Sequence, residues 1–273
     1  MRVVASSKGA RVALHDLGGK GPLVLFAHAN GFCGQIWQPV AVQLSHVARC
    51  WALDFRGHGD SVAGPEEDYH WANMADDVLT AVAMLDPPPR LAAGHSLGGA
   101  AILKAELAQP GTFDRAWLFE PIALPEEALS EEVIQALSEV ALKRQRVFAS
   151  RQVAYERYST RTPLSVLTSE ILQIYLDSGF RDLPDGTVTM KCAPEVEAAV
   201  VMNLDISLFD DLHKVVTKIT VCAGADSDPP AQLAFQIAEA LPNGSYECFG
   251  HLTHLGPLQD PQGAAASILA SLF

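Results

Sequence analysis

Short, continuously apolar segments alternate along the chain with segments of helical periodicity, and this alternation limits the folds that the chain can adopt. The apolar segments include residues 22–28 (PLVLFAH), 48–55 (ARCWALDF) and 90–95 (RLAAGH). Strands without a polar face are buried on both sides, by helices that cover both faces of a parallel sheet. The sequence therefore predicts an α/β fold with a mostly parallel central sheet flanked by helices, after an opening hairpin within residues 2–17.

The strand–helix alternation stops in the middle of the chain. Between residues 121 and 211 only helical patterns occur, and the alternation then resumes with KITVCAG at residues 218–224. We therefore expect a core formed by residues 1–120 and 212–273, with residues 121–211 inserted as a helical lid. Within this segment, apolar residues recur at helical steps of four and three, namely Leu129, Val133, Leu137 and Val140.

The overall charge argues against two classes of partner. The chain has 273 residues, a net charge of −13 and 49% apolar residues. An acidic surface repels phosphate backbones and anionic lipid head groups, so we expect no nucleic-acid partner and no membrane partner. The first residues lack the apolar core of a signal peptide, and no apolar run reaches the roughly 18 residues of a membrane span. We expect a cytoplasmic protein, and the sequence indicates no particular oligomeric state.

The cysteines indicate neither a disulfide framework nor a zinc site. Their number is odd, and no pair has the CxxC spacing. We therefore expect no metal ion, and no other pattern in the chain indicates an organic cofactor. The cysteines are Cys33, Cys50, Cys192, Cys222 and Cys248.

A glycine-rich turn, GHSLGG at residues 94–99, joins an apolar strand to a helix and fits the pattern G-x-S-x-G. The turn is so tight that the positions two before and two after the serine must be nearly free of side chain. It lifts the serine hydroxyl above the sheet edge, at the N-terminus of the following helix. Ser96 is therefore the predicted nucleophile. The alternative is a glycine-rich turn in which the serine is incidental.

A nucleophilic serine needs N–H donors for the developing oxyanion and a base for its proton. For the donors we predict the backbone amides of Leu97, directly after the nucleophile, and of Asn30, in the loop HANGFCGQIW after the third strand. His251 and His254 both follow the last strand. We predict His254 as the base, because six residues separate it from Pro261, which opens the closing helix, whereas His251 lies close to the strand end.

Together these segments resemble the lid-bearing serine hydrolases of the α/β-hydrolase family. The resemblance covers nearly the whole chain and includes HANGF, DFRGHGDS after the fourth strand, GHSLGG, and the spacing from His254 to a later Asp-Pro pair. It implies the α/β-hydrolase fold and a triad in the order nucleophile, acid, histidine. The family's usual His-Gly pair is His28-Ala29 here. DFRGHGDS is family-typical and structural, a loop held by Asp54 and Arg56.

The acid of the expected triad is ambiguous. The family's acid position in the loop AGADSDPP is occupied by Ser227, between Asp226 and Asp228. Some lid-bearing members instead take the acid from the end of the sixth strand, where this chain has Glu120. A glutamate after a mostly apolar strand needs a partner, and an imidazole would serve. We expect one of these three carboxylates to complete the triad, and place the aspartate loop ahead of Glu120.

The resemblance implies hydrolysis of a carboxylic ester, lactone or thioester of a small molecule through an acyl-serine intermediate. Haloalkane dehalogenases and epoxide hydrolases resemble the chain around residues 28–37, but they use aspartate where Ser96 stands and are excluded. Three alternatives stay open on the same scaffold: a carbon–carbon bond hydrolase, a cofactor-free peroxidase, and a non-catalytic ligand receptor.

The sign of the charge reverses locally between residues 143 and 161, where six basic residues face one acid, Glu156. One interpretation is a lid whose basic residues pair with the acidic core. The other is attraction of substrates that carry a carboxylate or phosphate. The basic residues are Lys143, Arg144, Arg146, Arg151, Arg157 and Arg161.

Overall fold

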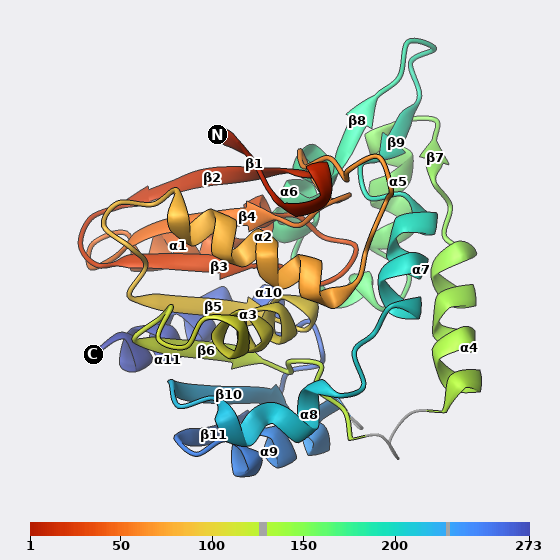
Figure 1. Ribbon diagram of the computed structural model, residues 1–273. Coiled ribbons are helices and arrows are strands. Elements are labelled where there is room, and N and C mark those ends of the chain that lie inside the picture. The colour runs from red at the N-terminus through yellow and green to blue at the C-terminus, as the bar shows by residue number, and fades with distance from the viewer. Residues whose placement is uncertain (126–129, 228–229) are drawn as a thin grey trace.

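The computed structural model describes residues 1–125, 130–227 and 230–273, and these build one eight-stranded sheet at the centre of the molecule (Figure 1). The strand order is β1-β2-β4-β3-β5-β6-β10-β11. The pairs β1–β2 and β2–β4 are antiparallel, and the pairs from β4 to β11 are parallel. The predicted opening hairpin and mostly parallel sheet are therefore confirmed. The strands are β1 (Arg2–Ala5), β2 (Arg11–Gly19), β3 (Leu23–Ala27), β4 (Arg49–Asp54), β5 (Leu91–His95), β6 (Arg115–Phe119), β10 (Lys218–Gly224) and β11 (Gly244–Phe249).

Helices cover both faces of this sheet. The core helices are α1 (Gln38–Leu44), α2 (Trp71–Ala83), α3 (Leu97–Ala108), α9 (Pro230–Ala240), α10 (Gly256–Gln259) and α11 (Pro261–Leu272). Val78 of α2, Ile102 of α3 and Ile237 of α9 belong to one buried apolar cluster. Val40 of α1 and Ile268 of α11 belong to a second. Burial on both faces explains why the strands have no polar side. None of the helices in the described ranges has the length and apolarity of a membrane-spanning helix.

The inserted segment, residues 121–211, lies between β6 and β10 in the chain and at the right of Figure 1. The prediction that it is only helical is wrong, because it contains a three-stranded antiparallel sheet in the order β7-β9-β8. These strands have two or three residues each, too few for a period-two pattern to be recognised. The strands are β7 (Val147–Phe148), β8 (Phe180–Asp182) and β9 (Val188–Met190), and the helices are α4 (Glu131–Leu142), α5 (Arg151–Tyr158), α6 (Ser169–Gly179), α7 (Pro194–Met202) and α8 (Leu208–Asp211).

The apolar residues predicted at helical spacing in the inserted segment lie mostly on α4. Leu129 lies outside the described residues, whereas Val133, Leu137 and Val140 lie on α4. Their side chains are exposed rather than buried, and α4 packs mainly against α7. The helical period was therefore read correctly, but the apolar stripe does not face the core.

Polar and aromatic contacts hold the inserted segment to the core. The Lys191 ammonium pairs with the Asp60 carboxylate at 2.6 Å. The indole N–H of Trp71 on α2 donates to the carbonyl oxygen of Val200 on α7, at 2.9 Å. The segment's own aromatic side chains, among them the buried Tyr175, join the same apolar cluster as α1 and α11. Segment and core therefore share one continuous interior.

Candidate active site

The turn after β5 has the geometry that a nucleophilic serine requires. Ser96 has backbone angles φ 54° and ψ −116°, outside the helix that begins at the next residue. A Cβ at Gly94 would lie 2.7 Å from the Gly98 carbonyl carbon, and a Cβ at Gly98 would collide with the Ala27 carbonyl oxygen on β3. Only glycine fits at these two positions. The positive φ of Ser96 is a strained conformation, which persists only where the surrounding structure holds it.

Glu120 and His254 are in direct contact beside this turn. Glu120 follows the last residue of β6, and its Oε2 lies 2.6 Å from His254 Nδ1. The carboxylate is fully buried, whereas the imidazole is 37% exposed. Because a carboxylate only accepts, Nδ1 carries the proton toward Glu120, which leaves Nε2 of a neutral ring free to act as a base.

Two further donors hold the other carboxylate oxygen of Glu120. Its Oε1 accepts the amide N–H of Gly224, at 2.8 Å, and the hydroxyl of Ser227. Glu120 itself has a positive φ of 42°, which is uncommon for a non-glycine residue and marks a constrained position. This arrangement brings together the ends of the neighbouring strands β6 and β10.

Of the two aspartates predicted as possible acids, the structure describes Asp226 alone, and this residue does not contact His254. Asp226 is exposed, and its backbone N–H donates to the Leu252 carbonyl at 3.0 Å, whereas the adjacent Ser227 points inward. Asp228 lies outside the described residues. Within the described ranges, the carboxylate against His254 therefore belongs to Glu120. The turn places residue 227 inward and residue 226 toward solvent, a register that the sequence alone did not reveal.

His254 contacts His95, the residue that precedes Ser96. The ring of His95, next to the serine, lies 5.1 Å from the His254 ring between centroids, and His95 Nε2 contacts the His254 carbonyl at 2.7 Å. Among the residues described, no hydrogen bond joins Ser96 Oγ to the imidazole. Such bonds are often long before substrate binds, so this geometry is compatible with general base catalysis. His251 instead lies 3.6 Å from Asp260 and is largely exposed.

The two predicted oxyanion donors lie on facing segments, and in the described residues neither backbone amide has a hydrogen-bond partner. Leu97 opens α3, where the first N–H groups of a helix are unpaired by geometry. The side chain of Asn30 is held on both sides. Its Nδ2 donates to the Glu197 carbonyl on α7 at 3.0 Å, and its Oδ1 lies 3.0 Å from His58 Nε2. The loop is thus fixed by both the core and the inserted segment.

Two other residues of the loop at residues 28–37, which contains Asn30, are structural. His28 donates from Nδ1 to the Ala29 carbonyl and accepts the Phe55 amide at Nε2, which is the pattern of a neutral ring. Its burial lowers its pKa. Burial also raises the pKa of the Cys33 thiol to about 12, so this cysteine is not a nucleophile at neutral pH.

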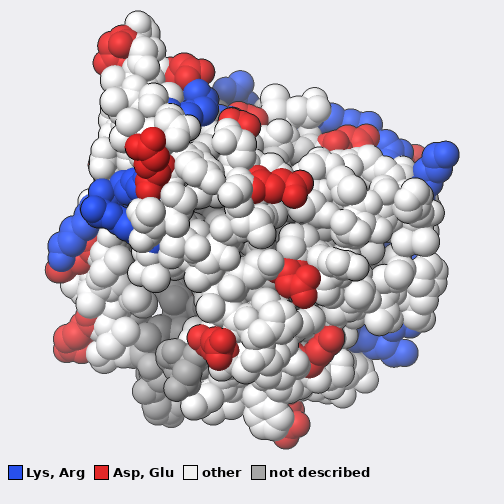
Figure 2. Space-filling model, turned by 180° about the vertical axis from the view of Figure 1, so that it is seen from behind, with Lys and Arg blue, Asp and Glu red and all other residues white. Residues whose placement is uncertain are grey.

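Three of the basic residues between positions 143 and 161 pair with acids of the inserted segment rather than with the core. Three pairs are Arg144–Glu197, Arg146–Glu195 and Arg151–Asp182. Figure 2 shows basic and acidic side chains close together over this part of the surface, on the left of that view. The expected pairing with the core is therefore wrong for these three arginines. Their charges are paired, although the stretch from residue 143 to residue 161 carries a net positive charge.

Arg144 has a second contact that links it to the site. Its guanidinium also donates to the Tyr175 hydroxyl at 3.0 Å, and the hydroxyl lies 3.4 Å from the Gly31 carbonyl. A Cβ at Gly31 would lie 3.0 Å from this guanidinium and 3.1 Å from the Glu197 carboxylate. The ion pair of Arg144 with Glu197 therefore packs directly against Gly31, in the loop beside Asn30.

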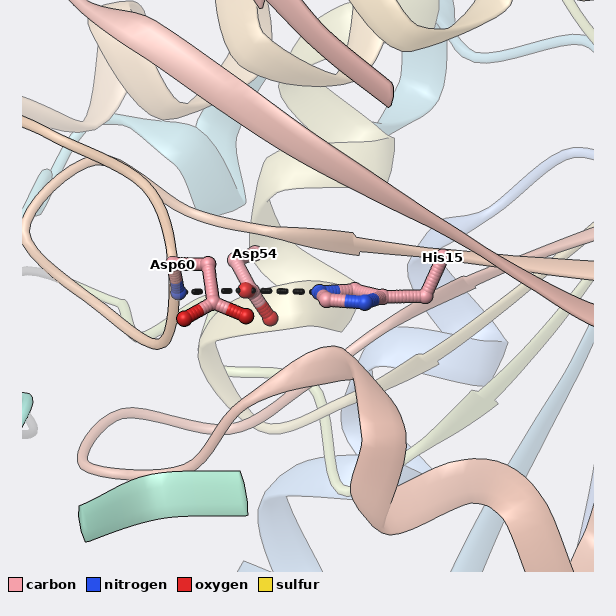
Figure 3. A group of neighbouring side chains, drawn as sticks. All are labelled: His15, Asp54 and Asp60. Atoms are coloured by element: carbon pink, nitrogen blue, oxygen red, sulfur yellow. Dashed lines mark hydrogen bonds and ion pairs between the residues drawn. The ribbon is translucent and has the colours of Figure 1, made fainter. Parts of the chain in front are cut away.

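A second cluster, His15, Asp54 and Asp60, has the residue types of a metal site (Figure 3). Its oxygens already have donors. Asp54 accepts from His15 Nε2 at 2.8 Å, from the Asp60 amide at 2.7 Å and from the Gly34 amide at 2.6 Å. Asp60 pairs with Lys191. Because hydrogen bonds and an ammonium occupy these oxygens, the cluster holds the DFRGHGDS loop in place, which is the structural role expected for Asp54.

The same loop is held by a buried ion pair. Arg56 binds Asp77 through Nη2, at 2.7 Å, and through Nε, at 3.0 Å, and both side chains are almost fully buried. A buried bidentate pair fixes geometry, since breaking it leaves an uncompensated charge. The structural role predicted for Arg56 is therefore confirmed.

The fold and the serine turn define an α/β hydrolase. The model of the alpha/beta hydrolase family matches residues 24–267, and the chain belongs to this family. Over 92 residues it is 35% identical to protein phosphatase methylesterase 1 of Bos taurus, a match that covers 32% of this chain and 24% of that protein. Over 80 residues it is 36% identical to 2-(acetamidomethylene)succinate hydrolase of Mesorhizobium japonicum, with 29% and 28% covered. These matches span about a quarter of each relative's length.

Solved structures match over nearly the whole chain. E-2-(acetamidomethylene)succinate hydrolase has a TM-score of 0.83 at 20% identity, with 99% of each chain covered. The thioesterase domain from the curacin biosynthetic pathway has a TM-score of 0.81 at 20% identity, with 99% of this chain and 98% of that chain covered. At such identities the similarity shows a common fold.

Sequence reasoning missed three residues around the site. Ser227 was noticed only as a departure from the family pattern, although a hydroxyl where an acid is expected was a usable signal. Glu197 on α7 and Arg144, just after α4, pack against the loop that contains Asn30 and Gly31. Nothing in the sequence connects residues so distant from Gly31 to that loop.

Proposed function

We propose that the protein hydrolyses carboxylic esters of small molecules, with Ser96 as nucleophile, His254 as general base and Glu120 as the acid of the triad. The observation that carries this proposal is the 2.6 Å contact between Glu120 Oε2 and His254 Nδ1, made by a fully buried carboxylate beside the serine turn. A buried carboxylate at this nitrogen fixes the tautomer of the ring and stabilises the imidazolium that forms during attack.

The chemistry runs through two acyl transfers. Ser96 Oγ attacks the ester carbonyl carbon while its proton moves to His254 Nε2. The tetrahedral intermediate collapses, the bond to the alcohol oxygen breaks, and the alcohol takes the proton from His254. Water then attacks the acyl-serine with His254 again as base, and the acid leaves as Ser96 regains its proton.

The oxyanion of each tetrahedral intermediate would be bound by the amides of Asn30 and Leu97. Their unpaired N–H groups on facing segments support this role. Such donors act most strongly when they are already oriented, and the Asn30 side chain is held at both ends.

We also propose that residues 121–211 act as a lid that selects the substrate. The support is their position against the oxyanion loop and the contact of α7 with Asn30. The names of the relatives suggest classes to assay, namely methyl esters and substrates that carry carboxylates. Lactones and thioesters belong in the same panel, because the acyl-serine route serves all of them.

The test combines a fluorophosphonate probe with p-nitrophenyl acetate and butyrate. Wild-type protein should be labelled and should hydrolyse both esters, and Ser96→Ala should lose labelling and activity. His251→Ala is the matched control for His254→Ala, because both histidines follow β11 and only His254 contacts Glu120. Labelling or hydrolysis that persists in Ser96→Ala would show that this serine is not the nucleophile. Intact hydrolysis in His254→Ala would contradict the role of the base.

A further inference from the structure

Ser227 stands on the loop after β10, and its side chain points at the Glu120 carboxylate that faces His254. The hydroxyl donates to Oε1 of Glu120, and it also lies 3.0 Å from the Gly224 carbonyl. The residue is 6% exposed, so solvent has little access to this contact. Ser227 has no role in the proposed chemistry itself, since it contacts neither Ser96 nor the imidazole among its described hydrogen bonds.

The two oxygens of Glu120 are in different surroundings. Oε1 accepts two donors fixed by the β10 end, the Gly224 amide and the Ser227 hydroxyl, whereas Oε2 faces the His254 ring. Donors on one oxygen fix the rotation of the carboxylate about the Cγ–Cδ bond of Glu120. They also stabilise its negative charge in a site from which water is excluded.

The backbone explains why residue 227 can reach this site. β6 and β10 are parallel neighbours, with Phe119 opposite Cys222, and the Glu120 amide donates to the Cys222 carbonyl at 2.8 Å. The carboxylate site therefore lies between the ends of two adjacent strands. A side chain from the end of either strand can point into it.

We propose that Ser227 is a positioning residue, which orients and stabilises the Glu120 carboxylate that faces His254. The proposal rests on the proposed function, because it assigns Ser227 an effect that passes through Glu120 to His254. It predicts an effect on kcat and little effect on KM, since no substrate contact is removed.

The first experiment measures kcat and KM for p-nitrophenyl butyrate in Ser227→Ala, Ser227→Thr and wild type. Loss of one hydrogen bond to a buried carboxylate should lower kcat about 10- to 100-fold, with KM within about twofold. Ser227→Thr keeps a hydroxyl and should regain most of the loss. Circular dichroism and thermal unfolding verify that each variant is folded. Unchanged kcat in folded Ser227→Ala would overturn the proposal.

The second experiment repeats Ser227→Ala in a Glu120→Gln background. If Ser227 acts through the carboxylate, its loss should have no further effect once that carboxylate is gone, so the two changes should be strongly non-additive. Additive losses would show that Ser227 acts independently of Glu120. Full activity in Glu120→Gln alone would instead refute the acid assignment, and activity in Ser96→Ala would refute the proposed function, so the three failures are distinguishable.

Discussion

At the residue scale, the site depends on which side chain the β10 loop directs inward. The sequence places Asp226, Ser227 and Asp228 together, and a shift of one residue exchanges the inward and outward positions. Of the two that the structure describes, Asp226 and Ser227, the inward side chain is the serine, and the carboxylate against His254 comes from the end of the neighbouring strand. The acid of the proposed triad is thus defined by packing between two strands rather than by a local motif.

Glu120→Gln should lower kcat on the order of 10⁴-fold, because the amide can favour the wrong tautomer of His254. Asp226→Asn is the matched control and should stay within about twofold, since this carboxylate is exposed and does not contact the ring. Steady-state kinetics with p-nitrophenyl butyrate compares them. A large loss in Asp226→Asn with little loss in Glu120→Gln would reverse the assignment.

At the element scale, the parts with strong local rules were predictable. The pattern of glycines around Ser96 predicted a strand–turn–helix, and the steric demands of Gly94 and Gly98 explain why the pattern is so informative. The short strand β7 was not predictable, because its partner β9 is distant in the chain, with Val147 opposite Thr189. The strands β8 and β9 form a local hairpin, but with three residues each they are too short to show a period of two. The acid also depends on such a distant pairing, that of β6 with β10.

Gly98→Ala should destabilise the protein by about 3 kcal/mol or more, because the new Cβ collides with the Ala27 carbonyl and the backbone of α3 must move. Gly250→Ala is the control: a Cβ there meets nothing within 4 Å, and it should change stability by less than about 0.5 kcal/mol. Urea unfolding followed by circular dichroism measures both. Similar midpoints for the two variants would contradict this steric explanation.

Arg144→Ala should lower kcat about tenfold, because the ion pair with Glu197 packs against Gly31 and a relaxed loop presents the Asn30 amide less accurately. Arg151→Ala removes a comparable pair of the same segment, with Asp182, and should leave kcat nearly unchanged. The same two variants also test whether the basic residues attract anionic substrates. In that case, their rates on carboxylate-bearing esters should fall more than their rates on neutral esters. Equal losses in both variants would argue against a specific link between Arg144 and the loop.

At the scale of the whole molecule, the interior contains several histidines that folding keeps neutral. Burial lowers the pKa of His28, lowers that of His58 to about 3, and lowers that of His95 well below its ordinary value. In the unfolded chain these rings take up protons below about pH 6.5. Because the unfolded state then binds more protons than the folded state, the stability must fall as the pH falls below that value.

Acid sensitivity should therefore begin in the range of histidine titration. With three such rings, the free energy of unfolding should fall by up to about 4 kcal/mol per pH unit below pH 6.5, and for His58 the fall continues toward about pH 3. Urea unfolding at pH 7.5, 6.0 and 5.0 measures the trend. His58→Gln, which cannot take up a proton, should show a shallower slope, and a flat stability between pH 7.5 and 5.0 would refute the prediction.

The contact between Asn30 and Glu197 has a consequence for protein engineering. One way to change specificity would be to exchange residues 121–211 for the inserted segment of another hydrolase. Here the backbone of α7 supplies a partner to the loop proposed to bind the oxyanion. A chimaera with another protein's inserted segment should therefore lose turnover together with its native selectivity, unless the new segment places a carbonyl acceptor at the Asn30 side chain.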